Sequence, residues 1–356
     1  MKRFNLLNGR TIKMERLLKG MIQGIAATAI VGLVSMPVQA LTLTDGDATA
    51  EIDQTGGGLV DLITNSDGLG QLVPDSPDHA DRVQWFVGNG GANPVSAFDV
   101  DPAVVDVDLS YDLLGGGAGS GLDEWRAKLT NTATFTNASA TDQSLDIYSY
   151  MNYDVTQVAG VSPAGSSETG TLGTFGAAPA KGQLVQGDTG AGGQSLSEVT
   201  TTLYQVGDTA FDGNADAGDL STLLGNLGSS HTIDPLSIDV VTVGDYNSSG
   251  NTDAGNLSTL LGQLGNSVPA PDGGEVADDG DTLSRVLANA GLLGTNSATD
   301  ASGGDDLNAA WHWNVTLAPG ESVQITTVTE VIPEPASLSL LGIGMTILLG
   351  RRIRRR

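Results

Sequence analysis

The sequence contains no cysteine, and its central part contains little positive charge. Without cysteine no disulfide can staple the chain, so order must come from a core of adequate size or from bound metal. Residues 1–40 and 351–356 hold 11 of the 16 Lys and Arg residues, whereas residues 41–332 hold five, together with 40 of the 42 acids. A surface of this charge repels nucleic acid and anionic lipid and attracts cations, so we expect no nucleic-acid partner.

The chain also lacks the short motifs of several enzyme classes. It has no G-x-S-x-G, no H-E-x-x-H and no G-x-x-x-x-G-K-[ST]. Its histidines number three, so a nucleophilic triad would have to use one of them. A glycosidase needs two carboxylates across a cleft, and the sequence singles out no such pair. We therefore expect a protein without catalytic activity, and a glycoside hydrolase stays open as the alternative.

Alternation with a period of two is the clearest local pattern. In the segment 105–113 the apolar residues fall on one face and aspartates and a serine on the other, as in a half-buried strand. Similar alternation occurs around 125–129 and 145–155. Trp311, Trp313, Val315 and Leu317, a turn at "APGE" and then Val323 and Ile325 predict a hairpin. Gly-rich punctuation between such strands predicts an antiparallel β-sandwich.

An internal repeat interrupts this pattern. Residues 207–228 align without gaps on residues 244–265 at an offset of 37, with 15 of 22 positions identical. Each copy ends in leucines at i, i+3, i+4 and i+7, which predicts a short amphipathic helix. We expect the two helices to pack on each other, and we expect no helix before Gly207 or Gly244. The leucines are Leu220, Leu223, Leu224 and Leu227, and Leu257, Leu260, Leu261 and Leu264.

Ahead of each helix the oxygen-bearing side chains have the spacing of a calcium loop, with glycine at position six. The first loop provides its ligands at positions one, five, seven (through the carbonyl), nine and twelve: Asp208, Asp212, Asn214, Asp216 and Asp219. The second fills positions one, three, five, seven, nine and twelve: Asp245, Asn247, Ser249, Asn251, Asp253 and Asn256. The alternative is a solvated acidic turn before each helix.

The first loop carries four carboxylates and the second carries two. Calcium affinity follows ligand charge and site rigidity, so the first loop should bind Ca²⁺ more tightly. Metal titration of variants that each disable one loop tests this order, and equal or reversed affinities would reject it.

These paired loop–helix units resemble dockerin repeats of the type I kind, over about residues 205–267. The resemblance implies calcium binding and a cohesin-like partner. Dockerins that plug into cellulosomes often carry hydroxyl residues at loop positions ten and eleven, where this chain has Ala217, Gly218, Ala254 and Gly255. The sequence therefore departs from that family at the positions that help to choose a cohesin.

The N-terminus has the pattern of a secretory signal peptide. A basic stretch to Lys19 is followed by an apolar run to Val34 and by "PVQA", so we expect cleavage after Ala40. An uncut membrane anchor is the alternative, and it fits less well because a spanning helix needs roughly 20 apolar residues.

The C-terminus resembles the PEP-CTERM sorting signal of exported proteins in Gram-negative bacteria. Pro333, Glu334 and Pro335 form the tripeptide, residues 336–350 the apolar segment, and the terminal arginines the basic tail. The resemblance implies transient retention in the inner membrane with the arginines inside, and processing by an exosortase-type enzyme. A plain C-terminal membrane anchor is the alternative. The strands at 41–53 and 311–335 resemble the first and last strands of a sandwich found in many such proteins.

Together the patterns predict five segments: a signal peptide at 1–40, a β-sandwich at 41–204 and 268–331, an inserted repeat pair at 205–267 and a sorting segment at 332–356. We expect an exported, non-catalytic protein of the cell surface or extracellular matrix that binds Ca²⁺. The rival function is a carbohydrate-active or glycan-binding component of a dockerin-based assembly, with extracellular polysaccharide as a partner.

Overall fold

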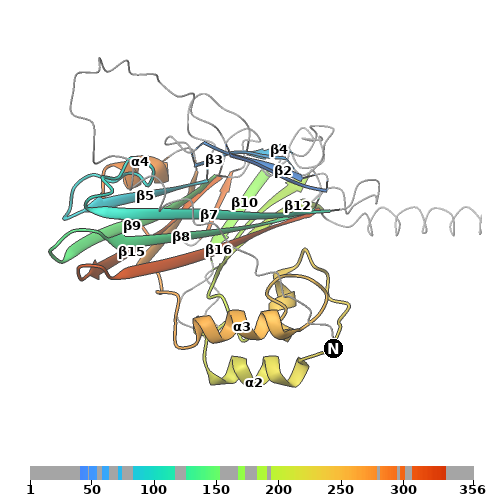
Figure 1. Cartoon of the computed structure of the whole chain (residues 1–356). Helices are drawn as coiled ribbons and strands as arrows, with labels where there is room; N and C mark the ends of the chain where they lie inside the picture. Colours follow the sequence, from blue (N-terminus) through green and yellow to red (C-terminus); the bar gives the residue numbers. More distant parts are fainter. Residues whose placement is uncertain are drawn as a thin grey trace, which may run out of the picture. The chain divides into compact units, whose positions relative to one another are not determined.

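The computed structural model describes residues 41–46, 48–53, 58–63, 71–73, 83–116, 126–152, 167–172, 183–190, 194–278, 281–294, 297–300 and 307–333. These residues form two antiparallel sheets with a helical insertion (Figure 1). The predicted fold class, a mainly β antiparallel sandwich with a small helical insertion, is confirmed.

The first sheet runs in the order β1, β2, β3, β5, β9, β15 and β13, with β4 beside β3 and β6 beside β5. All its described pairings are antiparallel. Its strands are β1 Leu41–Asp45, β2 Ala48–Asp53, β3 Gly58–Ile63, β4 Gln71–Val73, β5 Val83–Asn89, β6 Val95–Ser96, β9 Gln143–Asn152, β13 Gly273–Asp278 and β15 Leu307–Leu317.

The second sheet runs in the order β14, β10, β11, β12, β16, β8 and β7. Its strands are β7 Val105–Gly115, β8 Ala127–Asn137, β10 Ser167–Leu172, β11 Gln183–Gly190, β12 Gln194–Tyr204, β14 Ser297–Asp300 and β16 Ser322–Pro333. The described helices are α2 Ala217–Asn226, the 3-10 helix η3 Ile238–Val243, α3 Ala254–Gln263 and α4 Asp281–Leu287.

Aromatic side chains from both sheets meet in the core. The Trp85 ring of β5 lies 5.8 Å from the Phe135 ring of β8 and 5.9 Å from the Trp313 ring of β15. All three side chains are at most 1% exposed. Apolar contact of this kind supplies the order that a chain without disulfides needs.

The predicted alternation is confirmed in β7 and β8, whereas β9 is buried on both faces, because Tyr148 and Tyr150 on its outer face are only 1% exposed. In β7, Val105 and Leu113 are buried, whereas Asp106 and Asp108 are exposed. Leu129 in β8 and Leu145, Ile147 and Met151 in β9 face the core. Trp125, Tyr153 and Val155, which the same patterns include, lie outside the described residues.

The predicted hairpin of the last two strands is wrong, although its turn is present. β15 pairs with β9 and β13 in the first sheet, whereas β16 pairs with β8 and β12 in the second. Alternation shows which side chains face a core and does not identify the hydrogen-bonded neighbour. The turn at 318–321, closed by Glu321 N and Ala318 O at 2.9 Å, spans the space of about 10 Å between packed sheets.

The insertion leaves the second sheet after Tyr204 of β12 and returns to the first sheet at Gly273 of β13. Its helices α2 and α3 pack on each other, as predicted, through Leu223 and Leu260, which are fully buried (Figure 1). The rest of the predicted apolar face differs, because four of its leucines stay between 42% and 54% exposed: Leu224, Leu227, Leu261 and Leu264. The contact between these two ten-residue helices buries only one edge of each leucine stripe and leaves the rest of its width exposed.

A helix does precede the second repeat, contrary to the sequence-based expectation. The 3-10 helix η3 ends at Gly244, which has φ +84° and donates its N–H back to Val240 O and Val241 O. β-branched residues fill η3, and Gly244 closes it in the left-handed conformation that favours glycine. The first repeat, by contrast, follows strand β12.

Phe135→Ala should lower the free energy of unfolding by about 3–5 kcal/mol, because it leaves a cavity beside the Trp85 ring. Urea denaturation measures the change as a lower midpoint at unchanged slope. Val95→Ala is the control, since Val95 is 45% exposed and its loss should cost less than about 0.5 kcal/mol. Equal effects of the two substitutions would contradict the placement of Phe135 in the core.

Candidate metal-binding site

The two acidic loops have the same backbone conformation. Position six is Gly213 in the first loop and Gly250 in the second, with φ +88° and +80°. Position four is Phe211 and Ser248, and both have φ +54°, which non-glycine residues seldom adopt. The sharp turn predicted at the sixth position is therefore present in each loop.

Each loop pairs with the segment that follows the helix of the other repeat. Asn214 forms a bridge to Ser267, and the equivalent Asn251 forms a bridge to Ser230. Backbone hydrogen bonds follow the same exchange: Gly228 N to Thr252 O at 2.8 Å, Gly265 N to Ala215 O at 2.7 Å, Thr252 N to Ser229 O at 3.0 Å and Ala215 N to Asn266 O at 2.9 Å. The exchange relates the repeats by an approximate two-fold axis, so neither loop has its backbone partners without the other copy.

Side-chain packing follows the same two-fold exchange. Gly207, the first residue of the first repeat, lies against Leu260 of α3. Gly244, the first residue of the second repeat, lies against Leu223 of α2. A Cβ at Gly207 would lie 2.9 Å from Leu260 Cδ1, and one at Gly244 would lie 3.1 Å from Leu223 Cγ. Glycine is thus required at both positions for close approach as well as for positive φ.

Four of the predicted ligand side chains have a second task that the sequence analysis missed. Asp216 caps α2 by accepting from Gly218 N at 2.6 Å, and Asp219 accepts from Asp216 N at 2.7 Å. Asp253 and Asn256 form the same capping box on α3. An aspartate three residues before another Asp or Asn, directly ahead of an apolar run, is the sequence signature that predicts this cap. Positions nine and twelve therefore serve the helices whether or not metal binds.

The position-one carboxylate of the first loop is buried, and no basic residue in the described part of the chain pairs with it. Asp208 is 1% exposed and accepts from Ala210 N and Gly213 N at 3.0 and 2.7 Å. Asp219, 2% exposed, faces the same loop and accepts from Thr209 N and Oγ1. Burial, followed by the charges of Asp219 and Asp212, raises the pKa of Asp208 to about 6, against the lowering by its backbone hydrogen bonds. A cation at this point would relieve both causes of the shift.

The second loop satisfies its own polar groups more fully. Asp245, fully buried, accepts from Gly250 N at 2.8 Å and Ser249 N at 3.1 Å, and its Oδ2 lies 3.0 Å from His231 Nε2. Asn256 Nδ2 donates to Asn247 Oδ1 at 3.3 Å, which links positions twelve and three directly.

The predicted ligands differ in burial. Those at positions one and twelve are buried, whereas the other seven are exposed: Asp212, Asn214, Asp216, Asn247, Ser249, Asn251 and Asp253. Within the described ranges no three His, Asp or Glu side chains gather into one ligand group. The donor set of the first loop nevertheless suits a hard cation, because its side chains offer carboxylate oxygens around a buried Asp208.

A buried Lys–Glu pair, not predicted from the sequence, lies on the outer face of the second sheet. Lys128 of β8 and Glu330 of β16 lie opposite each other in register and are 6% and 7% exposed. Burial lowers the pKa of Lys128 and raises that of Glu330. The residues that cover them come from the insertion, and this contact is invisible to local patterns.

The insertion is joined to this face by polar and apolar contacts. Lys128 Nζ donates to Pro235 O at 2.5 Å and to Ser248 Oγ at 2.7 Å, and Glu330 Oε1 accepts from Ile238 N at 2.7 Å. Arg126 pairs with Asp234. An apolar cluster completes the joint between sheet and insertion: Tyr204, Val328, Phe211, Ile238, Val240 and Val241.

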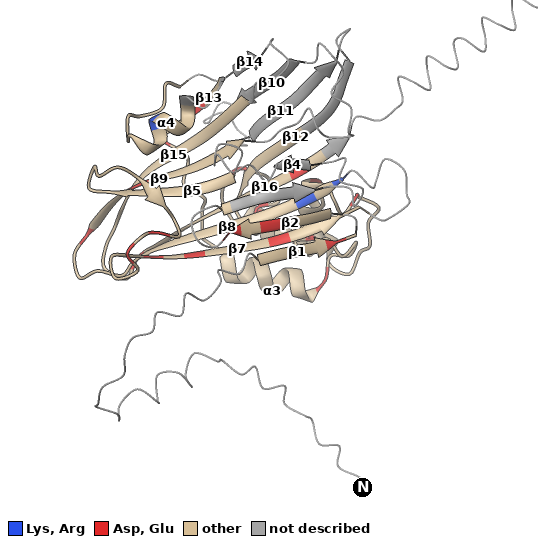
Figure 2. Cartoon of the chain, turned by 90° about the horizontal axis from the view of Figure 1, so that it is seen from above, with Lys and Arg blue, Asp and Glu red and all other residues tan. Residues whose placement is uncertain are grey.

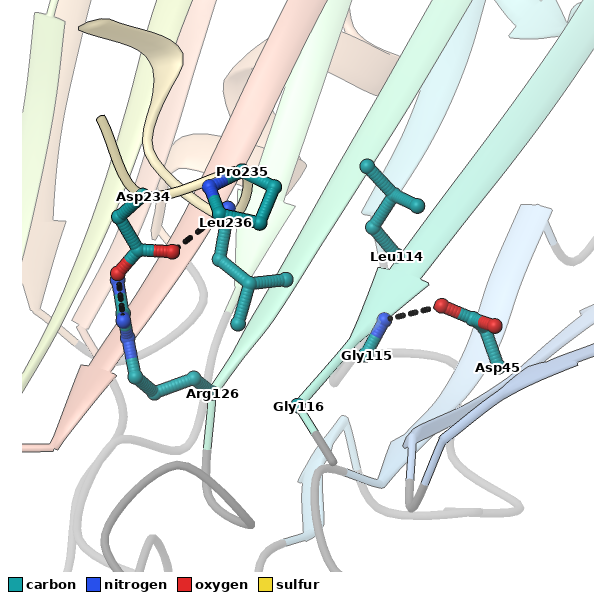
Figure 3. Close-up of a pocket in the computed structure, with 8 residues that line it drawn as sticks. All are labelled: Asp45, Leu114, Gly115, Gly116, Arg126, Asp234, Pro235 and Leu236. Carbon is teal, nitrogen blue, oxygen red and sulfur yellow. Dashed lines mark hydrogen bonds and ion pairs between the residues drawn. The ribbon is translucent and has the colours of Figure 1, made fainter. Parts of the chain in front are cut away.

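Two recesses lie along this joint. One of about 300 Å³ lies between Lys128, Tyr204 and the second loop. The other, of about 480 Å³, is lined by Asp45 and Asp234 (Figure 3). Figure 3 shows these two carboxylates on opposite sides, with Asp234 held by Arg126 and Asp45 accepting from Gly115 N. Asp45 is thus hydrogen-bonded to the backbone and Asp234 is paired with the Arg126 side chain.

The predicted export segments lie largely outside the described residues. Pro333 is the last residue of β16, whereas Glu334, Pro335, the tail and the signal peptide fall beyond the described ranges. Among the residues that the structure describes, no helix is both long enough and apolar enough to cross a membrane.

No protein-family model matches this chain, and no curated protein matches it. Among solved structures, a galactose mutarotase-like protein from Lactobacillus casei is similar over 82% of this chain and 100% of that protein. The sequence identity is 9% and the TM-score is 0.32. Similarity at this level carries no argument about activity.

Without metal, Asp208 should make stability fall as pH rises. Its pKa of about 6 in the folded protein exceeds the ordinary 3.8, so the folded state retains the proton more tightly. The stabilisation is complete below about pH 4 and is lost by about pH 6, a change on the order of 1–3 kcal/mol. Asp208→Asn should flatten this part of the profile in melts of chelator-dialysed protein. Asp106→Asn, which removes an exposed carboxylate of β7, is the control, and a parallel profile for wild type and Asp208→Asn would refute the assignment.

Proposed function

We propose that this chain is an exported protein of the cell surface or extracellular matrix, without catalytic activity, whose repeat pair binds Ca²⁺. The observation that carries the proposal is the buried, like-charged pair Asp208 and Asp219 in a loop of calcium-ligand spacing. Buried charge of one sign is costly unless something of the opposite sign compensates it.

The residues that would hold the ion are those of the first loop. They are the carboxylates of Asp208, Asp212, Asp216 and Asp219 and the carbonyl of Asn214. Bound there, Ca²⁺ supplies positive charge and a fixed set of oxygen contacts. The chain itself contributes the turn at Gly213, the backbone N–H groups that orient Asp208, and the cap that orients Asp219.

Metal binding in one loop would order more than that loop. Because each loop is bridged to the segment after the opposite helix, an ion in the first loop also fixes the end of α3. The insertion in turn covers Lys128 and Glu330 on the second sheet. Calcium would thus stabilise the fold of a chain that has no cysteine. Many other exported proteins use disulfides for this purpose.

The export and sorting parts of the proposal are supported by sequence alone. The basic and apolar stretches at both ends and the tripeptide Pro333, Glu334 and Pro335 favour secretion, an exosortase-type partner and retention at the envelope. The strongly acidic middle is compatible with a matrix that holds divalent cations.

The structure offers less support for the carbohydrate-active rival. Trp85, Trp311 and Trp313 are at most 1% exposed and belong to the sandwich core, so they present no platform for a sugar ring. The fourth tryptophan, Trp125, lies outside the described residues.

Addition of Ca²⁺ at about 100 times the dissociation constant should stabilise the protein by about 2.7 kcal/mol, and chelator should reverse the effect. Calorimetric titration measures the dissociation constant, and melting with and without chelator measures the stabilisation. Asp106→Asn is the matched control, because it removes one exposed carboxylate from β7 and leaves the loops intact. Asp208→Asn should abolish the calcium shift. Retention of the full shift in Asp208→Asn, or no specific binding in wild type, would reject the proposal.

A further inference from the structure

The two loops share a backbone but meet the sandwich differently. Position four of the first loop is Phe211, which packs with Tyr204 and Val328 in the apolar part of the joint. Position four of the second loop is Ser248, whose Oγ accepts from Lys128 Nζ at 2.7 Å. A lysine of the sandwich therefore reaches the second loop at the residue between two of its predicted ligands.

We infer that the second loop does not bind calcium and instead attaches the insertion to the sandwich. There the ammonium group of Lys128 supplies the positive charge that an ion would otherwise supply. The inference rests on the proposed function, because it treats the first loop as the ion site. It assigns one ion to each chain and gives the two copies of the repeat different tasks.

The electrostatic surroundings of the two position-one carboxylates support this assignment. Asp245 lies close enough to Lys128 for their charges to interact, and its Oδ2 is hydrogen-bonded to His231 Nε2. Asp208 instead interacts with the like charges of Asp219 and Asp212. The second loop is thus faced by the Lys128 ammonium group and by the His231 ring, whereas the first loop is faced by further carboxylates.

Three differences between the copies provide protein contacts within or beside the second loop that the first loop lacks. Asn247 and Asn256 close the second loop by a direct hydrogen bond, whereas the equivalent residues of the first loop are Ala210 and Asp219, between which no such bond is possible. His231, which contacts Asp245, corresponds to Val268. At each of these positions the second copy has a group that replaces a ligand–ion contact, and the first copy has an acid or an apolar residue.

Repulsion by the charge of Lys128 is the physical reason why the second loop would exclude Ca²⁺. Lys128 is buried, so its field at the second loop is weakly screened, and a divalent ion there would be repelled by it. Loss of this charge should raise the affinity of the second loop by about tenfold or more. The lysine cannot withdraw freely, since Pro235 O and Ser248 Oγ both hold its ammonium group.

Ion stoichiometry of the purified protein tests the inference. Equilibrium dialysis with Ca²⁺ should give one ion per chain for wild type, none for Asp208→Asn and one for Asp245→Asn. Two ions in wild type, or loss of the single ion in Asp245→Asn but not in Asp208→Asn, would overturn the inference and leave calcium binding intact. No ion in wild type would reject the proposed function itself, and the inference with it.

A gain of binding provides the converse test. Lys128→Met should take up a second ion, whereas Arg126→Met, which removes a neighbouring cation paired with Asp234, should still bind one. Circular dichroism establishes that each variant is folded. A folded Lys128→Met that binds one ion would overturn the role of the lysine. If that variant fails to fold, the comparison of Asp208→Asn with Asp245→Asn decides the question.

Discussion

The scarcity of positive charge is the constraint on which the arrangement of this protein depends. Figure 2 shows how few blue segments the described strands and helices carry. Of the five basic residues in 41–332, the three that the structure describes all hold one element against another. Arg285 joins α4 to the buried Glu275 of β13, and Arg126 and Lys128 join the insertion to the second sheet. Although acids are in large excess, each of these three cations is committed to a contact between two elements.

The same acidic residues serve local structure and the proposed ion site together. Asp216 and Asp219 cap α2, and Asp208 fastens the turn at Gly213, so the first loop is shaped before any ion enters. The reciprocal bridges then make that shape depend on the other copy of the repeat. Within this shared backbone the two loops differ in side chains, as at Phe211 and Ser248 or at Asp219 and Asn256.

The sequence predicted those features that follow from local periodicity. Alternation located β7 and the inward residues of β9, and the i, i+3, i+4, i+7 leucines located α2 and α3. Contacts between distant segments were not predictable in this way. Whether Trp313 and Ile325 share a sheet is decided by pairing across the sandwich, and the burial of Lys128 is decided by residues more than 100 positions away. The capping boxes could have been found, because their signature is local.

The placement of β16 has a mechanical consequence. This strand lies between β8 and β12 and ends at Pro333, where the proposed sorting segment begins. Its ladders pair Ser322–Val331 with β8 and Thr326–Pro333 with β12. A pull on the chain beyond Pro333, directed along the strand, loads both ladders in shear, because their hydrogen bonds lie across the direction of force. Many bonds then resist together, whereas a peeled edge strand loses them one at a time. A tether at this end would hold the domain by an interior strand, the attachment best suited to a protein under tension.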